Sequence, residues 1–215
     1  MSDFHLYDNV SVAAALARAR AEHKPIVLDL WSPTCSGCAK LFIKTYPDPG
    51  VQRFLSQFVA IKYDTTRVND YYKDLNPSTV HVWHPHITVM DDRLRQGRRF
   101  TGYFEPTAFI AQITLGAGML HLYHRRFAEA EIAFGNVASS SVPDSVVAEA
   151  LYWRGVAEYR GKGGFAALTR TWEEITTRFP GSDWAMRADC LDVSIPEAGF
   201  DPLDPSSVEL ILQHG

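Results

Sequence analysis

A short apolar segment that runs directly into two cysteines is the feature that most constrains the fold of this 215-residue chain. Residues 26–31 read Ile-Val-Leu-Asp-Leu-Trp, a nearly continuous apolar run of the kind that forms a strand covered on both faces. The chain then carries Cys35-Ser36-Gly37-Cys38, and residues 38–46 have helical spacing. The pattern predicts a buried strand, a loop with two cysteines, and a helix that begins at them.

The position of the two cysteines favours a reactive thiol. Cys35 stands at or just before the first turn of the predicted helix, where unpaired backbone N–H groups and the helix dipole favour an anion. The pKa of its thiol should therefore lie below that of a free cysteine, and the thiolate is the nucleophilic form. Cys38, one turn into the helix, is expected to be better shielded and to act as the resolving thiol.

The first half of the chain alternates predicted helices with predicted strands. Helices are predicted at residues 12–21, 38–46, 51–57, 70–75 and 106–120, and strands at residues 26–31, 58–63, 87–90 and 99–104. The early part forms a β-α-β unit and the late part an antiparallel hairpin. This order predicts an α/β fold, with a mixed sheet flanked by helices.

The second half of the chain has no convincing strand and repeats itself at a spacing of 37 residues. The matched pairs are Gly118 with Gly155, Ala130 with Ala167, Ala148 with Ala185, and Pro143 with Pro180, while Phe134 and Trp172 stand 38 residues apart. This helical pattern resembles the tetratricopeptide repeat, although the Trp expected early in the first helix is missing. The alternative is a chance similarity between two helix pairs. Because an array of two repeats is short, it is expected to lean on the first domain or on a second copy of the chain, as in a homodimer.

The strand, the C-x-x-C and the helix together resemble the thioredoxin superfamily. Its members carry a buried Asp six residues before the first cysteine and a Trp four residues before it, and Asp29 and Trp31 occupy these positions. They also carry a cis-proline before the third strand, which Pro85 matches, and Gly102 fits the small residue near the substrate groove. The resemblance covers residues 8–116 and implies a thioredoxin-like domain at residues 1–116, followed by a helical domain at residues 117–215.

The resemblance also implies a role for each matched residue. Asp29 would be the base that deprotonates Cys38, with its pKa raised by burial, and Trp31 would pack beneath the site. Pro85 would hold an extended client peptide beside Cys35 through backbone pairing. The expected partners are protein or peptide clients and a redox protein that donates or accepts electrons. No cofactor is implied other than the disulfide between Cys35 and Cys38.

The chain departs from the thioredoxin pattern next to the cysteines. Ser36 and Gly37 replace the Gly-Pro of reducing thioredoxins, and Thr34 replaces the usual aromatic residue before the first cysteine. His84 precedes Pro85 where an aliphatic residue is common. Since each of these residues touches the sulfurs, the reduction potential of the pair can lie anywhere from roughly −270 to −120 mV. The sequence therefore does not decide between a reductant and an oxidant.

Three histidines near Pro85 support a competing interpretation. If Pro85 is the cis-proline, His84 and His86 lie near the two cysteines, and a metal site made of Cys35, Cys38, His84 and His86 is conceivable. His81 belongs to the same cluster. Alternatively, these imidazoles tune the thiolate as nearby partial positive charges, or they are ordinary surface residues. A four-thiolate zinc site is excluded within one chain because no second C-x-x-C exists.

The overall composition excludes several classes of protein. A net charge of −4 gives no electrostatic reason to expect nucleic acid or an anionic membrane as a partner. No apolar run approaches the roughly 18–20 residues needed to cross a bilayer. The first ten residues lack the basic and apolar segments of a secretory signal, so a cytoplasmic protein is expected. The odd count of three cysteines, with Cys190 expected to be a buried small hydrophobe, argues against a structural disulfide framework.

The sequence therefore predicts thiol–disulfide exchange on protein clients through Cys35 and Cys38, with the helical repeats docking a client or partner. A redox-sensing chaperone that binds clients without turnover is the alternative from a different class. A metal-binding protein that uses cysteine and histidine ligands ranks third.

Overall fold

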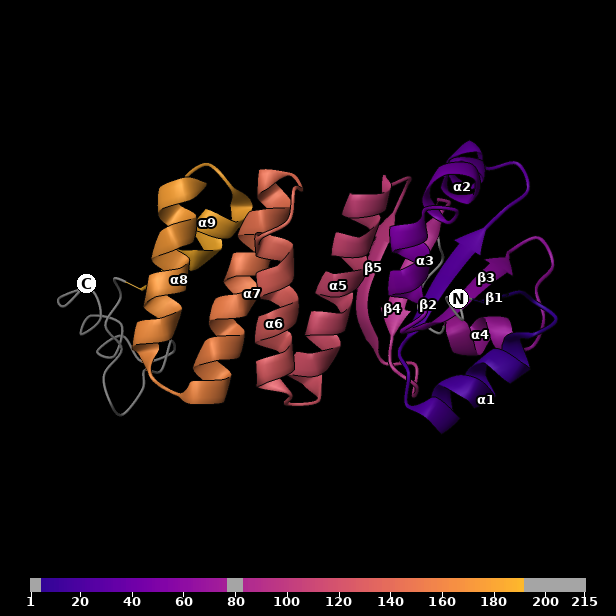
Figure 1. Cartoon of the computed structure of the whole chain (residues 1–215), viewed down its shortest axis with the longest axis horizontal. Helices are drawn as coiled ribbons and strands as arrows, with labels where there is room; N and C mark the ends of the chain where they lie inside the picture. Colours follow the sequence, from indigo (N-terminus) through magenta and orange to yellow (C-terminus); the bar gives the residue numbers. More distant parts are fainter. Residues whose placement is uncertain (1–4, 77–82, 192–215) are drawn as a thin grey trace, which may run out of the picture.

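The computed structural model describes residues 5–76 and 83–191 of the chain. In this part, five strands form one sheet in the order β1-β3-β2-β4-β5. Their bounds are β1 Leu6–Tyr7, β2 Ile26–Trp31, β3 Val59–Asp64, β4 His86–Met90 and β5 Gln96–Thr101. Strands β1, β3 and β2 are parallel, whereas β4 runs antiparallel to β2 and β5 runs antiparallel to β4. The predicted mixed sheet is confirmed, and the strand that leads to the cysteines lies at its centre (Figure 1).

Helices surround this sheet and then continue away from it (Figure 1). Their bounds are α1 Val12–Glu22, α2 Ser36–Lys40, α3 Pro49–Leu55, α4 Tyr71–Leu75, α5 Pro106–Tyr123, α6 Phe127–Ala138, α7 Asp144–Lys162, α8 Phe165–Arg178 and α9 Asp183–Ala188. A π-helical turn, η1 Leu41–Thr45, follows α2 directly. Within the described residues, no helix is long and apolar enough to span a membrane.

Each face of the sheet carries its own apolar core. Side chains alternate along β2, so Leu28 and Leu30 pack with α1 on one face, while Val27 packs with Val51 of α3 and Phe109 of α5 on the other. Because both faces are covered, β2 needs an almost continuous apolar sequence. Asp29 is the one charged residue in this strand, and its side chain lies 1% exposed.

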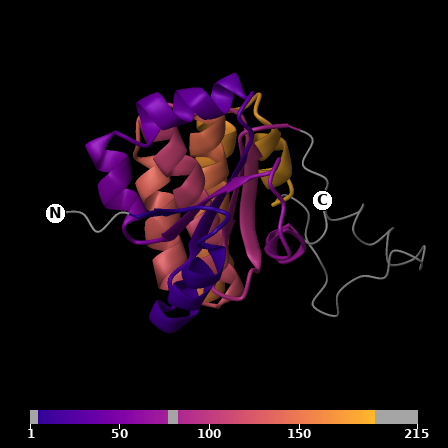
Figure 2. The ribbon, with the colours of Figure 1, turned by 90° about the vertical axis from the view of Figure 1, so that its right-hand side faces the viewer.

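The helical region is stacked onto the sheet through α5. Helix α5 packs against β5, and α6, α7 and α8 follow as a row of neighbouring helices (Figure 1). Figure 2, turned by 90°, looks along this row from the sheet end. Two glycines allow α5 to approach closely: a Cβ on Gly116 would lie 2.7 Å from the Cβ of Val89, and one on Gly97 would lie 2.4 Å from the Gly116 carbonyl oxygen.

A charged side chain fastens the sheet to the helices beyond α5. Arg98 of β5 donates to Gln112 of α5 at 2.8 Å and, through Nη2, to Oε2 of Glu149 in α7 at 2.9 Å. The guanidinium and the carboxylate pair in the bidentate manner that gives Arg–carboxylate contacts their strength. The predicted boundary between residues 116 and 117 falls inside α5, so this helix belongs to both parts. The division into two domains stays a prediction.

The same glycine–aromatic contact occurs in two successive helix pairs. A Cβ on Gly118 of α5 would lie 2.6 Å from the Phe134 ring of α6, and one on Gly155 of α7 would lie 3.0 Å from the Trp172 ring of α8. These are the residues that the 37-residue spacing matches, with Trp172 displaced by one. Their small size lets each helix pair close around an aromatic side chain. The resemblance to tetratricopeptide repeats stays a prediction.

One predicted strand is displaced in the structure, and one short strand of the structure was not predicted. The strand predicted at residues 99–104 is β5, Gln96–Thr101, because pairing with β4 joins Thr101 to His86 and leaves the following residues outside the ladder. At Gly102 the backbone turns away with φ +101°. Strand β1 was not predicted, since its two residues are too few for an alternating pattern and form a strand only by pairing with β3.

We expect Gly118→Ala to lower the free energy of unfolding by about 2 kcal/mol, because the added methyl group must displace the buried Phe134 ring. The matched control is Gly135→Ala in α6, where a Cβ would meet nothing within 4 Å. That change should raise stability by up to about 1 kcal/mol, since alanine favours a helix. Urea unfolding of both variants checks this, and equal effects would contradict the close contact at Gly118.

Candidate functional site

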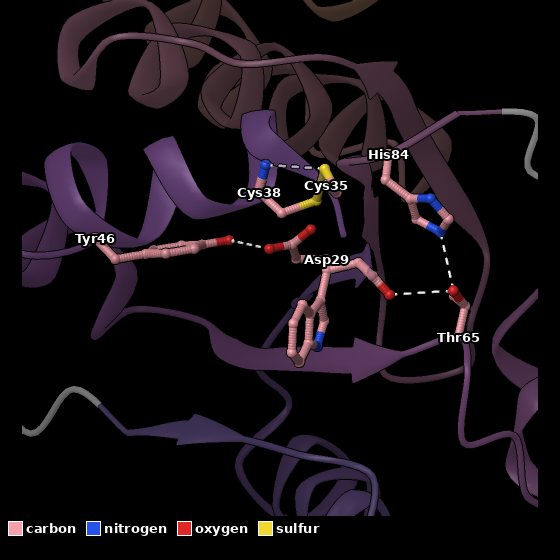
Figure 3. Close-up of a disulfide and its surroundings, with 7 residues drawn as sticks. Asp29, Cys35, Cys38, Tyr46, Thr65 and His84 are labelled. Carbon is pink, nitrogen blue, oxygen red and sulfur yellow. Dashed lines mark hydrogen bonds between the residues drawn. A yellow bond between two sulfur atoms is a disulfide. The ribbon is translucent and has the colours of Figure 1, made fainter. Parts of the chain in front are cut away.

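The two cysteines form a disulfide where β2 gives way to α2 (Figure 3). Cys35 is the N-cap of α2 in an extended conformation, and its Sγ accepts a hydrogen bond from the Cys38 backbone N–H at 3.0 Å. A donor aimed at the sulfur favours the thiolate once the bond is reduced. Cys35 is half-buried, whereas Cys38 is 2% exposed. The prediction that Cys38 is the better shielded thiol is confirmed.

A groove with a volume of about 450 Å³ borders Cys35. The peptide bond between His84 and Pro85 is cis, and the proline ring forms part of the groove wall. A Cβ on Gly37 would lie 3.0 Å from Cδ of Pro85, so a residue without a side chain lets the cysteine loop approach the proline. Gly102 also lines the groove and donates its N–H to the Pro85 carbonyl at 2.9 Å.

His84 is anchored to the strand that leads to the cysteines. The Thr65 hydroxyl donates to the Trp31 carbonyl at 3.1 Å and lies 2.9 Å from Nε2 of His84 (Figure 3). Because the hydroxyl proton is used on Trp31, the His84 ring donates through Nε2 to the Thr65 oxygen. This chain of contacts fixes the imidazole at the rim of the groove.

Asp29 lies buried beneath the disulfide. One carboxylate oxygen, Oδ2, accepts a hydrogen bond from the Tyr46 hydroxyl at 2.8 Å. Within the described residues the other oxygen, Oδ1, has no hydrogen-bond partner, and Figure 3 shows it turned toward the disulfide. Burial raises the pKa of the Asp29 carboxyl to about 6, against the opposing effects of the Tyr46 hydrogen bond and the charge of Lys62. A group with this pKa can exchange a proton near neutral pH.

Lys62 and Tyr46 contact Asp29 or its neighbours, and nothing in the sequence pointed to either residue. Lys62 is the register partner of Asp29 on β3, and its Nζ lies 4.2 Å from the ring centroids of both Trp31 and Phe42. Burial lowers the pKa of Lys62, while the charges of Asp29 and Asp64 oppose this effect. The strand register that pairs Lys62 with Asp29 has no signal in the sequence itself. Trp31 thus carries the Lys62 cation on its ring face, and its packing beneath the site stays a prediction.

The alternative metal site of Cys35, Cys38, His84 and His86 is not formed. The two sulfurs are bonded to each other, and alternation along β4 places His86 on the face opposite Ile87 and therefore opposite Asp29. Throughout residues 5–76 and 83–191, no group of three or more His, Cys, Asp or Glu side chains is arranged to hold a metal ion. His81 lies outside the described residues. Cys190 is exposed, so its predicted burial was wrong.

The comparisons with known proteins concern the first part of the chain. Residues 7–92 match the family described as Thioredoxin-like. The thiol:disulfide interchange protein DsbD of Vibrio vulnificus, strain CMCP6, is 29% identical over 100 residues, which cover 46% of this chain and 17% of that protein. The chain thus spans less than a fifth of the length of this curated relative. Residues 7–92 are therefore similar in sequence to this family, and the mixed five-stranded sheet agrees with the fold that the sequence predicts.

Solved structures that resemble about half of this chain include a DsbD domain and a thioredoxin. The C-terminal domain of Neisseria meningitidis DsbD in the oxidised form has a TM-score of 0.40 and 23% identity, and the match covers 49% of this chain and 92% of that domain. A thioredoxin from Thermus thermophilus has a TM-score of 0.42 and 18% identity, with 53% of this chain and 85% of that chain covered.

We expect Asp29→Asn to stabilise the oxidised protein above about pH 6 but not below about pH 4. The folded state holds the Asp29 proton up to about pH 6, whereas an unfolded chain releases it near the usual value of 3.8. The contribution of Asp29 to the free energy of unfolding is therefore complete below pH 4 and is lost as the pH rises through 6. Above that pH the protein is less stable by about 3 kcal/mol. Asparagine does not ionise, so the variant should not lose this stability. Urea unfolding of the variant and the parent between pH 4 and pH 8 measures the difference.

The matched control for this measurement is Asp70→Asn, because Asp70 is exposed at the start of α4. Its stability relative to the parent protein should stay nearly constant over the same pH range. A difference between Asp29→Asn and the parent that does not change with pH would show that Asp29 ionises normally in the fold.

Proposed function

We propose that this protein catalyses thiol–disulfide exchange on protein clients, with Cys35 as the nucleophile and Cys38 as the resolving thiol. The observation that carries the proposal is the arrangement around the disulfide: Cys35 borders an open groove beside a cis-proline, and Cys38 lies above a buried carboxyl group. The Thioredoxin-like match and the named activity of the DsbD relative support it.

In the direction that reduces a client, the Cys35 thiolate attacks one sulfur of the client disulfide. A Cys35–client disulfide forms, the client S–S bond breaks, and the other client sulfur leaves as a thiolate that takes a proton from solvent. Asp29 then accepts the proton of the Cys38 thiol, and the Cys38 thiolate attacks the Cys35 sulfur. The Cys35–Cys38 bond forms and the second client sulfur leaves, so the client is reduced by two electrons and the protein is oxidised.

The same steps in reverse oxidise a client dithiol. The direction depends on the reduction potential of the Cys35–Cys38 pair relative to the redox protein that exchanges electrons with it. Ser36, Gly37 and His84, which differ from the reducing thioredoxin pattern, all border the groove beside Cys35. Equilibration with glutathione of known redox ratio measures this potential.

We also propose that the helical region holds a client or partner protein near the groove. The Arg98–Glu149 pair and the close contact of α5 with the sheet hold α5, α6 and α7 against the thioredoxin-like part. A client bound to these helices would therefore stay at a set distance from Cys35, which raises its effective concentration at the disulfide. The cytoplasmic location stays a prediction.

The exchange activity is tested with a disulfide-bonded client such as insulin and dithiothreitol as the reductant. The protein should accelerate insulin reduction, and Cys35→Ser should return the rate to that of dithiothreitol alone. Cys38→Ser should accumulate disulfide-linked complexes with clients, because the attack on Cys35 is then missing. These complexes are detected on gels without reducing agent.

The control is Cys190→Ser, which removes the exposed third cysteine and should leave both results unchanged. The alternative function is a chaperone that binds clients without turnover. If Cys38→Ser traps no client while the intact protein prevents aggregation of a heated client, the exchange activity is wrong and the chaperone is favoured. Stoichiometric zinc or copper in protein purified without a His tag would favour the metal-binding alternative.

A further inference from the structure

The Tyr46 side chain reaches the site from a turn that is not an ordinary helix. The Tyr46 backbone N–H donates to the Leu41 carbonyl at 2.9 Å, five residues back, which is the hydrogen bond of a π-helical turn. In an α-helix, residues five apart lie about 140° from each other around the axis. Here Leu41 and Tyr46 instead belong to the same buried core between the sheet and α5. The turn therefore directs Tyr46 inward, toward β2.

The contacts of Tyr46 divide between its ring and its hydroxyl. The ring packs edge-on against Phe109 of α5 with centroids 5.7 Å apart, and the residue is 5% exposed. The hydroxyl donates to Oδ2 of Asp29 at 2.8 Å. A buried hydroxyl that donates to a carboxylate stabilises the charged form of that group and fixes its orientation.

Few other groups lie close enough to Asp29 to influence its ionisation or its orientation. Lys62 reaches it from β3, and the Cys35–Cys38 pair lies on the α2 side. The neighbouring β4 residue is Ile87, and α5 contributes Phe109 to this core, so neither element adds a titratable group there. Tyr46 is therefore the one hydrogen-bond donor to this carboxylate among the described residues.

We propose that Tyr46 is a positioning residue for disulfide exchange: its hydroxyl holds one oxygen of Asp29, so that the other oxygen faces the disulfide and takes the proton of Cys38. This inference rests on the proposed function. Without the hydroxyl, the carboxylate loses a stabilising hydrogen bond, and Asp29 stays protonated to a higher pH. A protonated Asp29 cannot accept the Cys38 proton, so the resolving step becomes slower on the acidic side.

The test uses the reduced protein with Cys190→Ser as the parent and Ellman's reagent, dithiobis-nitrobenzoate, as a chromogenic disulfide. Cys35 attacks the reagent and releases one thionitrobenzoate, which leaves a mixed disulfide on Cys35. Cys38 then attacks Cys35 and releases the second thionitrobenzoate. Stopped-flow absorbance separates the two releases, and the rate of the second is measured between pH 4.5 and pH 9. The inflection due to Asp29 is the one that Asp29→Asn abolishes.

In Tyr46→Phe this inflection should move to a pH higher by roughly one, since a hydrogen bond to a charged group and one pKa unit represent similar free energies. At pH values below the inflection, the second release should slow roughly tenfold, and well above it the rates should converge. The double variant Tyr46→Phe with Asp29→Asn should have the same profile as Asp29→Asn alone. An unshifted inflection in Tyr46→Phe would overturn the proposal.

The matched control is Tyr63→Phe. Tyr63 is also fully buried in this domain, but its hydroxyl donates to Asn69 at 2.8 Å, and it packs on the α1 face of the sheet. It loses a hydroxyl of the same kind without touching Asp29, so its profile should match the parent. A shift of equal size in Tyr63→Phe would show a general loss of structure and would also overturn the proposal.

A second measurement does not depend on exchange activity. The carboxyl carbon of Asp29 is followed by ¹³C NMR during a pH titration of the oxidised protein. The parent should titrate at about 6, and Tyr46→Phe should titrate higher. Identical titrations would overturn the role of Tyr46. A different outcome would count against the proposed function instead. If the titration shifts but Asp29→Asn does not change the rate of the second release, then Asp29 is not the base.

Discussion

The rest of this site depends on the burial of one carboxyl group in the middle of the sheet. Asp29 is 1% exposed on β2, and removing it from water raises its pKa to about 6. Such a group is tolerated only where neighbours offset the cost of its charge. Tyr46 offsets this cost from the π-helical turn, and Lys62 offsets it from β3. The sheet register and the helix geometry therefore both stabilise this one side chain.

The cysteines and the groove lie next to this buried carboxyl group. Cys38 is buried above Asp29, while Cys35 stays half-buried at the edge of a groove bounded by the cis-proline. The two sulfurs of one loop therefore have different surroundings: Cys35 borders the open groove, whereas Cys38 is buried near the Asp29 carboxyl group. This difference is what a two-step exchange requires, because attack and resolution need thiols in separate environments.

The helical region is connected to this site through packing rather than through a linker. Helix α5 contributes Phe109 to the core around Tyr46 and, further along, Gly118 to the contact with Phe134. One continuous helix therefore takes part in both contacts. The close contacts at Gly97 and Gly116 hold this helix against the sheet.

The sequence by itself determined the strand at residues 26–31 and the two cysteines that follow it, because these depend on spacing within a single short segment, and the order of elements along the chain determined the mixed sheet. The resemblance to the thioredoxin superfamily assigned Asp29 to the same site. The same resemblance, which includes the cis bond, also placed Pro85. Only the tertiary structure decided which distant side chains meet them. The register of β3 brings in Lys62, the π-helical turn brings in Tyr46, and alternation along β4 directs His86 to the other face. Each of these depends on pairing or on helix phase, and a shift of one residue would reverse it.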